Sequence, residues 1–194
     1  MHYTQCEYSM PSFFGYTQSF ETLWEWIARA PSQQRHPMRA PTVMTTTKNI
    51  PNARTMILRD VLPNTLIFFT DKRSPKVHDI QSNAHTTIHS YDAKKKLQLR
   101  IRAQASLVHE HPQLNRWRSM GLNRFQDYGS SLPPGTPVQE GTLHSATMDT
   151  ARENFCVLLF LATDIELLKL SRDGHQRVEW KNQAGIWSMS RLVP

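Results

Sequence analysis

The segment that most constrains the fold is LQLRIRAQASLVH, residues 97–109, in which apolar and polar residues alternate. Leu97, Leu99 and Ile101 occupy every second position, and the positions between them carry glutamine and arginine. Because successive side chains of a β-strand point to opposite faces, this pattern predicts a strand with one buried face and one wet or functional face. Such a strand is typical of an antiparallel sheet.

Similar β-rich segments recur along the chain and are separated by turn signals. They lie at residues 42–48, 53–61, 65–70, 85–92, 155–170, 176–182 and 186–193. The letters LPN and QAG predict antiparallel hairpins at two of the intervening turns. We therefore expect a mainly β fold with peripheral helices, in which an antiparallel sheet of roughly six to eight strands closes into a small barrel.

Two helices are predicted beside this sheet. Residues 19–30 carry apolar side chains at helical spacing after Ser19, a plausible N-cap, and residues 74–83 begin a short helix with Pro75 in its first turn. Residues 121–150 show no sustained period, which predicts a long functional or mobile loop. The 194 residues are enough for one sizeable core, so we expect a single domain over residues 1–194.

Composition limits the environment more than the function. The net charge of +7 would attract nucleic acid, acidic lipid or a phosphorylated small molecule, and a basic solvated surface without a specific partner is an equal alternative. The chain has no apolar block long enough for a membrane span and no secretory signal, so we expect a cytoplasmic protein without membrane association. The chain has only two cysteines, Cys6 and Cys156, and we expect both to be reduced thiols.

Metal and nucleophile signals are weak. His85 and His89 stand four residues apart in a predicted strand, which separates them by about 13 Å. His109 and His111 would share a strand face, but no third ligand is evident. No Gly-x-Ser-x-Gly motif, catalytic cysteine setting or dinucleotide-binding glycine pattern occurs. We therefore expect no bound metal.

Positive charge gathers at the ends of two predicted strands. Arg54 and Arg59 stand five residues apart, roughly 16 Å in an extended chain. Strict alternation would place them on opposite faces, so a single ligand could meet both only across a bulge or a twist. Edge-strand arginines that serve solubility are the alternative.

A stronger cluster follows at the third strand. It lies where a strand runs into a helix start, so backbone N–H groups, hydroxyls and cationic side chains can converge on one phosphate. Its residues are Thr70, Asp71, Lys72, Arg73, Ser74 and Lys76. A solvated charged turn is the alternative interpretation. The pattern nevertheless favours a phosphate-binding site.

Taken in order, these segments resemble the FMN-binding split barrel of pyridoxamine 5'-phosphate oxidase and its relatives. The resemblance rests on ARTMILRD, FFTDKRSPK, LQLRIRAQA and the terminal HQRVEW to WSMSRLVP, and it spans roughly residues 20–194. It implies FMN as cofactor and a homodimer with FMN between the subunits, so that some contacts would cross the interface. It also implies a flavin-dependent oxidoreductase.

The resemblance assigns a set of FMN-binding residues. They are Arg54, Thr55, Met56, Ile57, Arg59, Phe69, Thr70, Arg73, Ser74, Lys76, Gln98 and Arg177. Arg54, Ser74 and Lys76 would hold the phosphate, and Arg73 would replace a family arginine that is Pro75 here. Phe69 and Thr70 would hold the ribityl-phosphate end, and Gln98 would reach the flavin from a neighbouring strand.

The same resemblance assigns residues to the part of the site that would face the flavin ring. Arg59, where the family has lysine, would face the ring and substrate. Arg177 would approach the N1–C2 carbonyl edge, where positive charge stabilises reduced flavin. The family's Arg-x-His substrate pair appears here as Asp173, Gly174 and His175, so a carboxylate replaces the arginine and His175 becomes the candidate catalytic residue.

Two further family features are missing. The helical Tyr-x3-Arg-x3-Ser signature for substrate phosphate has no match in QLNRWRSMGLNRFQDYGSS, and a family tryptophan falls near Leu167 or Leu168. The resemblance thus implies retained FMN and a changed pocket for an unidentified small-molecule substrate. Because the dinucleotide-binding glycine pattern is absent, any nicotinamide cofactor would bind transiently on the flavin.

Two other functions stay open. One is a genuine pyridoxamine 5'-phosphate oxidase with a rearranged pocket. The other is a non-catalytic protein that binds flavin, haem or nucleic acid, the last through KKKLQLRIR and Tyr91. Nucleic acid is the less favoured partner, because it does not require the set Arg54, Ser74, Lys76 and Arg177.

Overall fold

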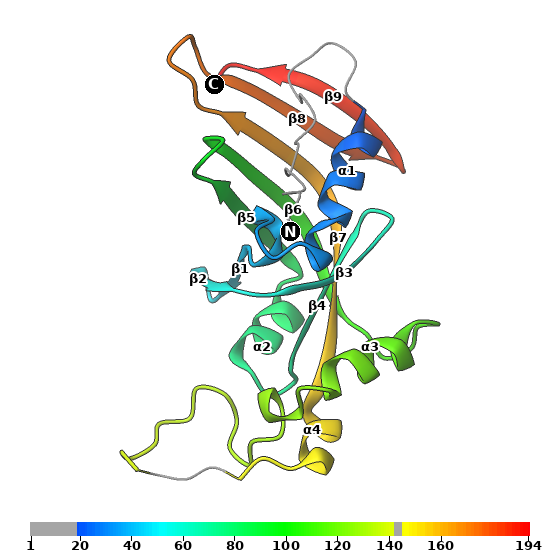
Figure 1. The fold of residues 1–194 in the computed structure, drawn as a ribbon, viewed down its shortest axis with the longest axis vertical. Helices are drawn as coiled ribbons and strands as arrows, with labels where there is room; N and C mark the ends of the chain where they lie inside the picture. The colour runs from blue at the N-terminus through cyan, green and yellow to red at the C-terminus, as the bar shows by residue number, and fades with distance from the viewer. Residues whose placement is uncertain (1–18, 142–144) are drawn as a thin grey trace, which may run out of the picture.

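We describe the protein from a computed structural model covering residues 19–141 and 145–194. Its strands form one antiparallel nine-stranded sheet, shown in Figure 1. The strands are β1 (Thr42–Thr47), β2 (Ile50–Thr55), β3 (Leu58–Leu62), β4 (Thr65–Asp71), β5 (His85–Asp92), β6 (Leu97–Leu107), β7 (Phe155–Lys169), β8 (Gln176–Gln183) and β9 (Ile186–Leu192). The helices are α1 (Phe20–Ala28), α2 (Pro75–Ser82), α3 (Leu114–Leu122) and α4 (Met148–Asn154), with short 3-10 turns η1 (Ala30–Ser32), η2 (Pro37–Arg39) and η3 (Phe125–Asp127).

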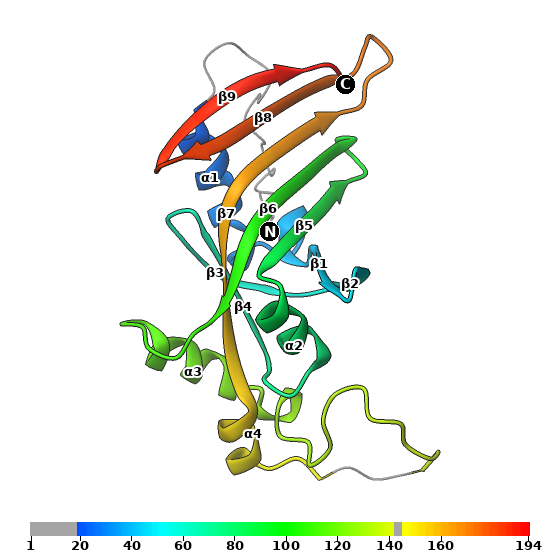
Figure 2. The ribbon, with the colours of Figure 1, turned by 180° about the vertical axis from the view of Figure 1, so that it is seen from behind.

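The long strand β7 divides the sheet. One of its edges pairs with β6 along most of its length, whereas the other pairs first with β4 and then with β8. The strand order is therefore β2-β1-β5-β6-β7-β4-β3, with β8 and β9 branching from β7. Seen from behind in Figure 2, β8 and β9 follow the upper half of β7, and β3 and β4 cross its lower half.

Strands β4 and β7 are buried on both faces. Phe68 and Phe160 point into the main core with α1, and their rings meet edge to face at 5.1 Å. Ile67 and Val157 point the other way, into a second apolar cluster shared with α3 and α4. This double burial explains why both strands read as continuous apolar runs instead of alternating ones.

Most of the predicted elements are confirmed. Helix α1 begins after Ser19, whose Oγ accepts a hydrogen bond from the Thr22 N–H at 3.4 Å. Helix α2 begins at Pro75 as expected, and both predicted hairpins occur, β3–β4 and β8–β9. His85 and His89 both lie on strand β5, as predicted.

Four expectations were wrong. The run 53–61 is not one strand: it breaks between Thr55 and Leu58, where the Met56 N–H bonds the Pro41 carbonyl at 3.0 Å, and the sheet consequently has nine strands. Strand β6 ends at Leu107, so the pair at 109 and 111 shares no strand face. The start and end of region 121–150 are helical, in α3 and α4. Helix α3 itself was not predicted.

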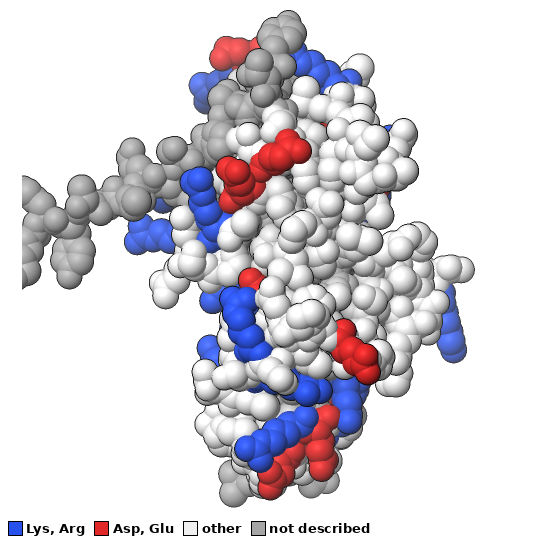
Figure 3. All heavy atoms as spheres, turned by 90° about the vertical axis from the view of Figure 1, so that its right-hand side faces the viewer, with Lys and Arg blue, Asp and Glu red and all other residues white. Residues whose placement is uncertain are grey.

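Two properties bear on the surroundings of the protein. In the described part of the chain, no helix is both long and apolar enough to cross a bilayer. On the face shown in Figure 3, basic and acidic side chains are interspersed among large uncharged areas. That face does not carry the continuous basic stripe typical of a nucleic-acid interface.

Candidate functional site

Three of the predicted phosphate ligands meet at the N-terminus of α2. Thr70 comes from the end of β4, and Ser74 and Lys76 come from the start of the helix. The Thr70 Oγ1 and Ser74 Oγ atoms lie 3.3 Å apart, and Lys76 Nζ donates to Thr70 Oγ1 at 3.1 Å. Ser74 is fully buried. The hydroxyls and the ammonium group thus form one connected cluster.

Arg54 approaches this cluster from β2. Burial lowers the pKa of Lys76, and the nearby positive charge of Arg54 lowers it further. Two cations held this close beside two hydroxyls supply the charge and the donors that bind a phosphate dianion. We call Arg54, Thr70, Ser74 and Lys76 the phosphate cluster; its donor set fits the phosphate of FMN.

Contacts with strand β1 and helix α2 orient Arg54. Its Nη1 donates to Thr45 Oγ1 at 2.6 Å, and its Nη2 lies 3.4 Å from Asp79 Oδ2. The side chain remains 23% exposed, so part of the guanidinium is accessible to a ligand.

Arg73 does not join the phosphate cluster. Its Nε and Nη2 donate to the two carboxylate oxygens of Asp71 at 3.0 and 2.7 Å, and this hydrogen bonding raises the pKa of Arg73. Nη2 also donates to the Ser130 carbonyl at 2.9 Å. Arg73 therefore ties the segment after η3 to the β4–α2 turn instead of adding charge to the cluster.

Arg59 lies in a different environment from Arg54. The β3–β4 register shifts between Leu58 and Asp60, so Arg59 occupies a bulge. Its guanidinium carbon lies 5.8 Å from the centre of the Phe69 ring. Between the two arginines, Thr55 and Ile57 are exposed, whereas Met56 is buried in the core.

Tyr128 is a functional candidate that the sequence pattern did not reveal. Burial raises its pKa, whereas the charge of Arg59 and a hydrogen bond with it act in the opposite direction. The residue follows η3 in a stretch without periodicity, and only its aromatic identity could have marked it. Arg59, Phe69 and Tyr128 together place a cation, a hydroxyl and an aromatic ring side by side.

Gln98 and Arg177 share the outer face of the sheet. Leu168 of β7 lies directly between them in register, opposite Gln98 of β6 and Arg177 of β8. This face is opposite to the core face, because Gln98 alternates with the buried residues Leu97 and Leu99. The structure therefore brings Gln98 and Arg177 into the same row.

A buried carboxylate holds Arg177. Glu166 is 5% exposed, and its Oε2 accepts from Arg177 Nη2 at 2.7 Å and from Arg100 Nη2 at 2.5 Å. Hydrogen bonding and charge from Glu166 raise the pKa of Arg177. The role of Glu166 was not predicted, since alternation alone does not indicate which outer-face residues pair.

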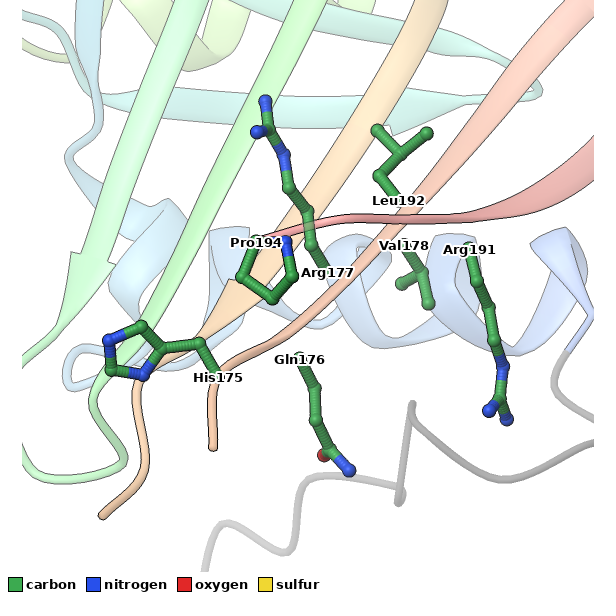
Figure 4. Close-up of a pocket in the computed structure, with 7 residues that line it drawn as sticks. All are labelled: His175, Gln176, Arg177, Val178, Arg191, Leu192 and Pro194. Atoms are coloured by element: carbon green, nitrogen blue, oxygen red, sulfur yellow. The ribbon is translucent and has the colours of Figure 1, made fainter. Parts of the chain in front are cut away.

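His175 and Arg177 flank a surface hollow at the C-terminus. The hollow is lined by His175, Gln176, Arg177, Val178, Arg191, Leu192 and Pro194, drawn in Figure 4. There the side chains of His175 and Arg177 point in different directions. His175 Nδ1 accepts from the Ser171 N–H at 3.2 Å, so the candidate catalytic histidine caps the β7–β8 turn.

Other reactive groups form no second site among residues 19–141 and 145–194. No group of three or more His, Cys, Asp or Glu side chains there could hold a metal ion. Burial raises the pKa of the Cys156 thiol to about 11, so this cysteine is neutral at physiological pH. Cys6 lies outside the described residues.

Comparison with protein families gives a match over the part of the chain that carries most of these residues. Residues 17–109 match the family model for "Pyridoxamine 5'-phosphate oxidase, FMN-binding domain". The matched region contains the whole phosphate cluster, Arg59 and Gln98, whereas His175 and Arg177 follow it. No curated protein sequence matches the chain significantly.

Solved structures show the same fold. A pyridoxamine 5'-phosphate oxidase-related, FMN-binding protein from Nostoc punctiforme PCC 73102 is 23% identical, with a TM-score of 0.69 over 92% of this chain and 99% of that one. PhzG from Burkholderia lata 383, solved with tetrahydrophenazine-1-carboxylic acid, is 16% identical, with a TM-score of 0.73 over 96% of this chain and 98% of that one. The predicted split β-barrel is therefore confirmed.

Proposed function

We propose that this chain, which belongs to the pyridoxamine 5'-phosphate oxidase-like family of FMN-binding split barrels, is a flavin-dependent oxidoreductase acting on a small-molecule substrate. When bound, FMN supplies the capacity to accept and release electrons. The observation that carries the proposal is the phosphate cluster, in which Lys76 bonds Thr70 beside Ser74 and the charge of Arg54 lies near enough to lower the pKa of Lys76.

We also propose that two subunits build each site. Arg54 lies opposite Val43 of β1 in the register of the sheet, and the same row continues through Ile88 of β5 and Ile101 of β6. Because Ile88 and Ile101 are buried in the core, Arg54 lies on the core face. Gln98 and Arg177 lie on the other face of the same sheet. Because the sheet separates the two sets, one FMN meets both only if a second copy supplies one of them, as in a two-fold homodimer.

On the substrate side, Arg59 and Tyr128 offer a cation and a hydroxyl beside the Phe69 ring. These groups suit a substrate that carries an anionic or strongly polar substituent. His175 is exposed and bonded to the Ser171 backbone, so we assign it no proton transfer.

A subunit-mixing experiment tests the shared site. Arg54→Ala should lose FMN, whereas Arg177→Ala should keep FMN at a lower reduction potential, because positive charge near the ring stabilises the reduced form. If the two variants are refolded together, random pairing should restore the parental potential at roughly a quarter of the sites. A site confined to one chain predicts no parental sites in the mixture.

Anaerobic titration tests the reaction. The FMN-loaded protein is mixed with a reduced nicotinamide dinucleotide or with pyridoxamine 5'-phosphate, and the visible flavin absorbance is followed before and after air is admitted. Bleaching by the dinucleotide with recovery in air supports a general flavin-dependent oxidoreductase. Bleaching by pyridoxamine 5'-phosphate supports the vitamin B6 alternative, and no bleaching by either reductant contradicts catalysis.

A further inference from the structure

Asp79 is a buried acid that lies next to the phosphate cluster without being part of it. It is 4% exposed, on α2. Its Oδ2 accepts from Thr45 Oγ1 at 2.5 Å and lies 3.4 Å from both Asn52 Nδ2 and Arg54 Nη2. Its Oδ1 accepts from Thr47 Oγ1. Every one of these partners belongs to the β1–β2 hairpin.

The position of Asp79 matters because the phosphate cluster is built from separate elements. Arg54 belongs to the hairpin, whereas Ser74 and Lys76 belong to the helix start. Asp79 stands three residues after Lys76, on the neighbouring turn of the helix. Its bonds to the hairpin therefore set where Arg54 lies relative to Lys76.

Thr45 strengthens this link. Its hydroxyl donates to Asp79 and accepts from Arg54 Nη1 at 2.6 Å, so a single hydroxyl orients both charged groups. Thr45 is itself buried, which holds its side chain in place. Arg54 is thus fixed by a direct ion pair and by a bridging hydroxyl.

The charge of Asp79 is directed toward the hairpin. Burial raises the pKa of the carboxyl, but hydrogen bonds from Thr45 and Thr47 and the charge of Arg54 outweigh burial, so the pKa lies below its ordinary value. Both oxygens are occupied by hairpin donors. An ionised Asp79 therefore orients Arg54 while its negative charge is satisfied within the protein.

We propose that Asp79 is a positioning residue that holds Arg54 toward the phosphate and thereby makes the site prefer FMN over riboflavin, which lacks the phosphate. This inference rests on the proposed FMN site. It assigns a specificity role to a residue that contacts the ligand only through Arg54.

The test compares the two flavins. FMN and riboflavin are titrated separately into the wild-type protein and into Asp79→Ala, with quenching of flavin fluorescence as the readout. We expect Asp79→Ala to weaken FMN binding by roughly 10- to 100-fold, by analogy with the loss seen when a residue that orients a metal ligand is removed. Riboflavin binding should stay within about twofold, because it does not use Arg54.

Two other variants control the experiment. Asn83→Ala also removes a bond between α2 and the hairpin, from Asn83 Nδ2 to Thr46 Oγ1 at 2.9 Å, but Asn83 has no contact with Arg54, so both affinities should stay unchanged. Asp79→Asn keeps the shape of the side chain and removes its charge. This variant replaces Asp79→Ala in the titrations if Asp79→Ala does not fold. We expect a several-fold selective loss of FMN from it.

The outcomes separate the inference from the function on which it rests. Selective loss of FMN in the Asp79 variants supports the inference. Unchanged or tighter FMN binding, or equal weakening of both flavins, overturns it while the FMN site stands. A wild-type protein that binds FMN no better than riboflavin overturns the phosphate site and the Asp79 role together.

Discussion

Arg54 and Arg73 show what decides the use of a charged residue at this site. Both lie in the segments that predict phosphate binding, and both meet a carboxylate. Asp71 accepts from two nitrogens of Arg73 at 3.0 Å or less, whereas only one nitrogen of Arg54 meets Asp79, at 3.4 Å. The sequence indicates that cations gather here, but it does not indicate which acid each cation meets.

At the same scale, His36 predicts a pH dependence of stability. Its Nδ1 accepts from the Met38 N–H at 3.0 Å, so Nε2 donates to the Trp26 carbonyl at 2.9 Å. Burial lowers its pKa from 6.5 to about 4. Between these two pKa values His36 is protonated in the unfolded chain but neutral in the folded one. The free energy of unfolding is therefore highest above pH 6.5 and decreases as the pH falls toward 4.

We expect this loss to reach roughly 2 kcal/mol of unfolding free energy. Urea unfolding measured in steps from neutral pH to about pH 4 checks it. His36→Gln should be less stable at neutral pH but should lack this component of the slope. A parental protein whose stability does not fall across the window would show that the imidazole is not kept neutral by burial.

At the scale of elements, the predicted and missed segments differ in how they bury their side chains. Strands β6 and β7 were evident because one alternates and the other is almost continuously apolar. Helix α3 was missed because only Trp117 and Gly121 of its nine residues are buried, which is too few to create a helical period. The break between β2 and β3 has no Gly or Pro to mark it.

Gly121 gives a prediction for the packing of α3 on β7. An added Cβ would lie 2.0 Å from Cε2 of Phe155, and that ring is already packed edge-on against Phe69 and Tyr128, each at 5.1 Å. Gly121→Ala should therefore destabilise the fold by roughly 1–3 kcal/mol, although alanine favours a helix by about 1 kcal/mol.

Urea denaturation measures this effect, with Ser119→Ala on the exposed side of the same helix as the matched control. Ser119→Ala should be neutral or slightly stabilising. If the two variants were equally stable, α3 would not be packed against Phe155 as described.

At the scale of the whole molecule, the order of the segments was more informative than any single motif. The antiparallel barrel, the resemblance to the family and FMN as cofactor were predicted from that order; the barrel is confirmed, and residues 17–109 match the FMN-binding family model. The substrate remained open because Asp173 stands where the family's substrate pair has an arginine, and because the family's signature for substrate phosphate has no match. The roles of Glu166 and Asp79 could not be predicted, since Glu166 bonds Arg100 and Asp79 bonds Arg54, and both partners lie far away in sequence.

The division of the site between the two faces of one sheet also belongs to this scale. Arg54 lies on the core face of the sheet, whereas Gln98 and Arg177 lie on its outer face. A homodimer resolves this separation, and mixing the Arg54→Ala and Arg177→Ala chains tests it directly.

The central claim is that the phosphate cluster holds FMN. It is tested most directly by the visible spectrum of the purified protein after FMN is added and the sample is passed through a desalting column. We predict retained flavin absorbance that corresponds to about one FMN per chain. A colourless protein after desalting would contradict the account, and it would mean that Arg54 and Lys76 serve a different anion.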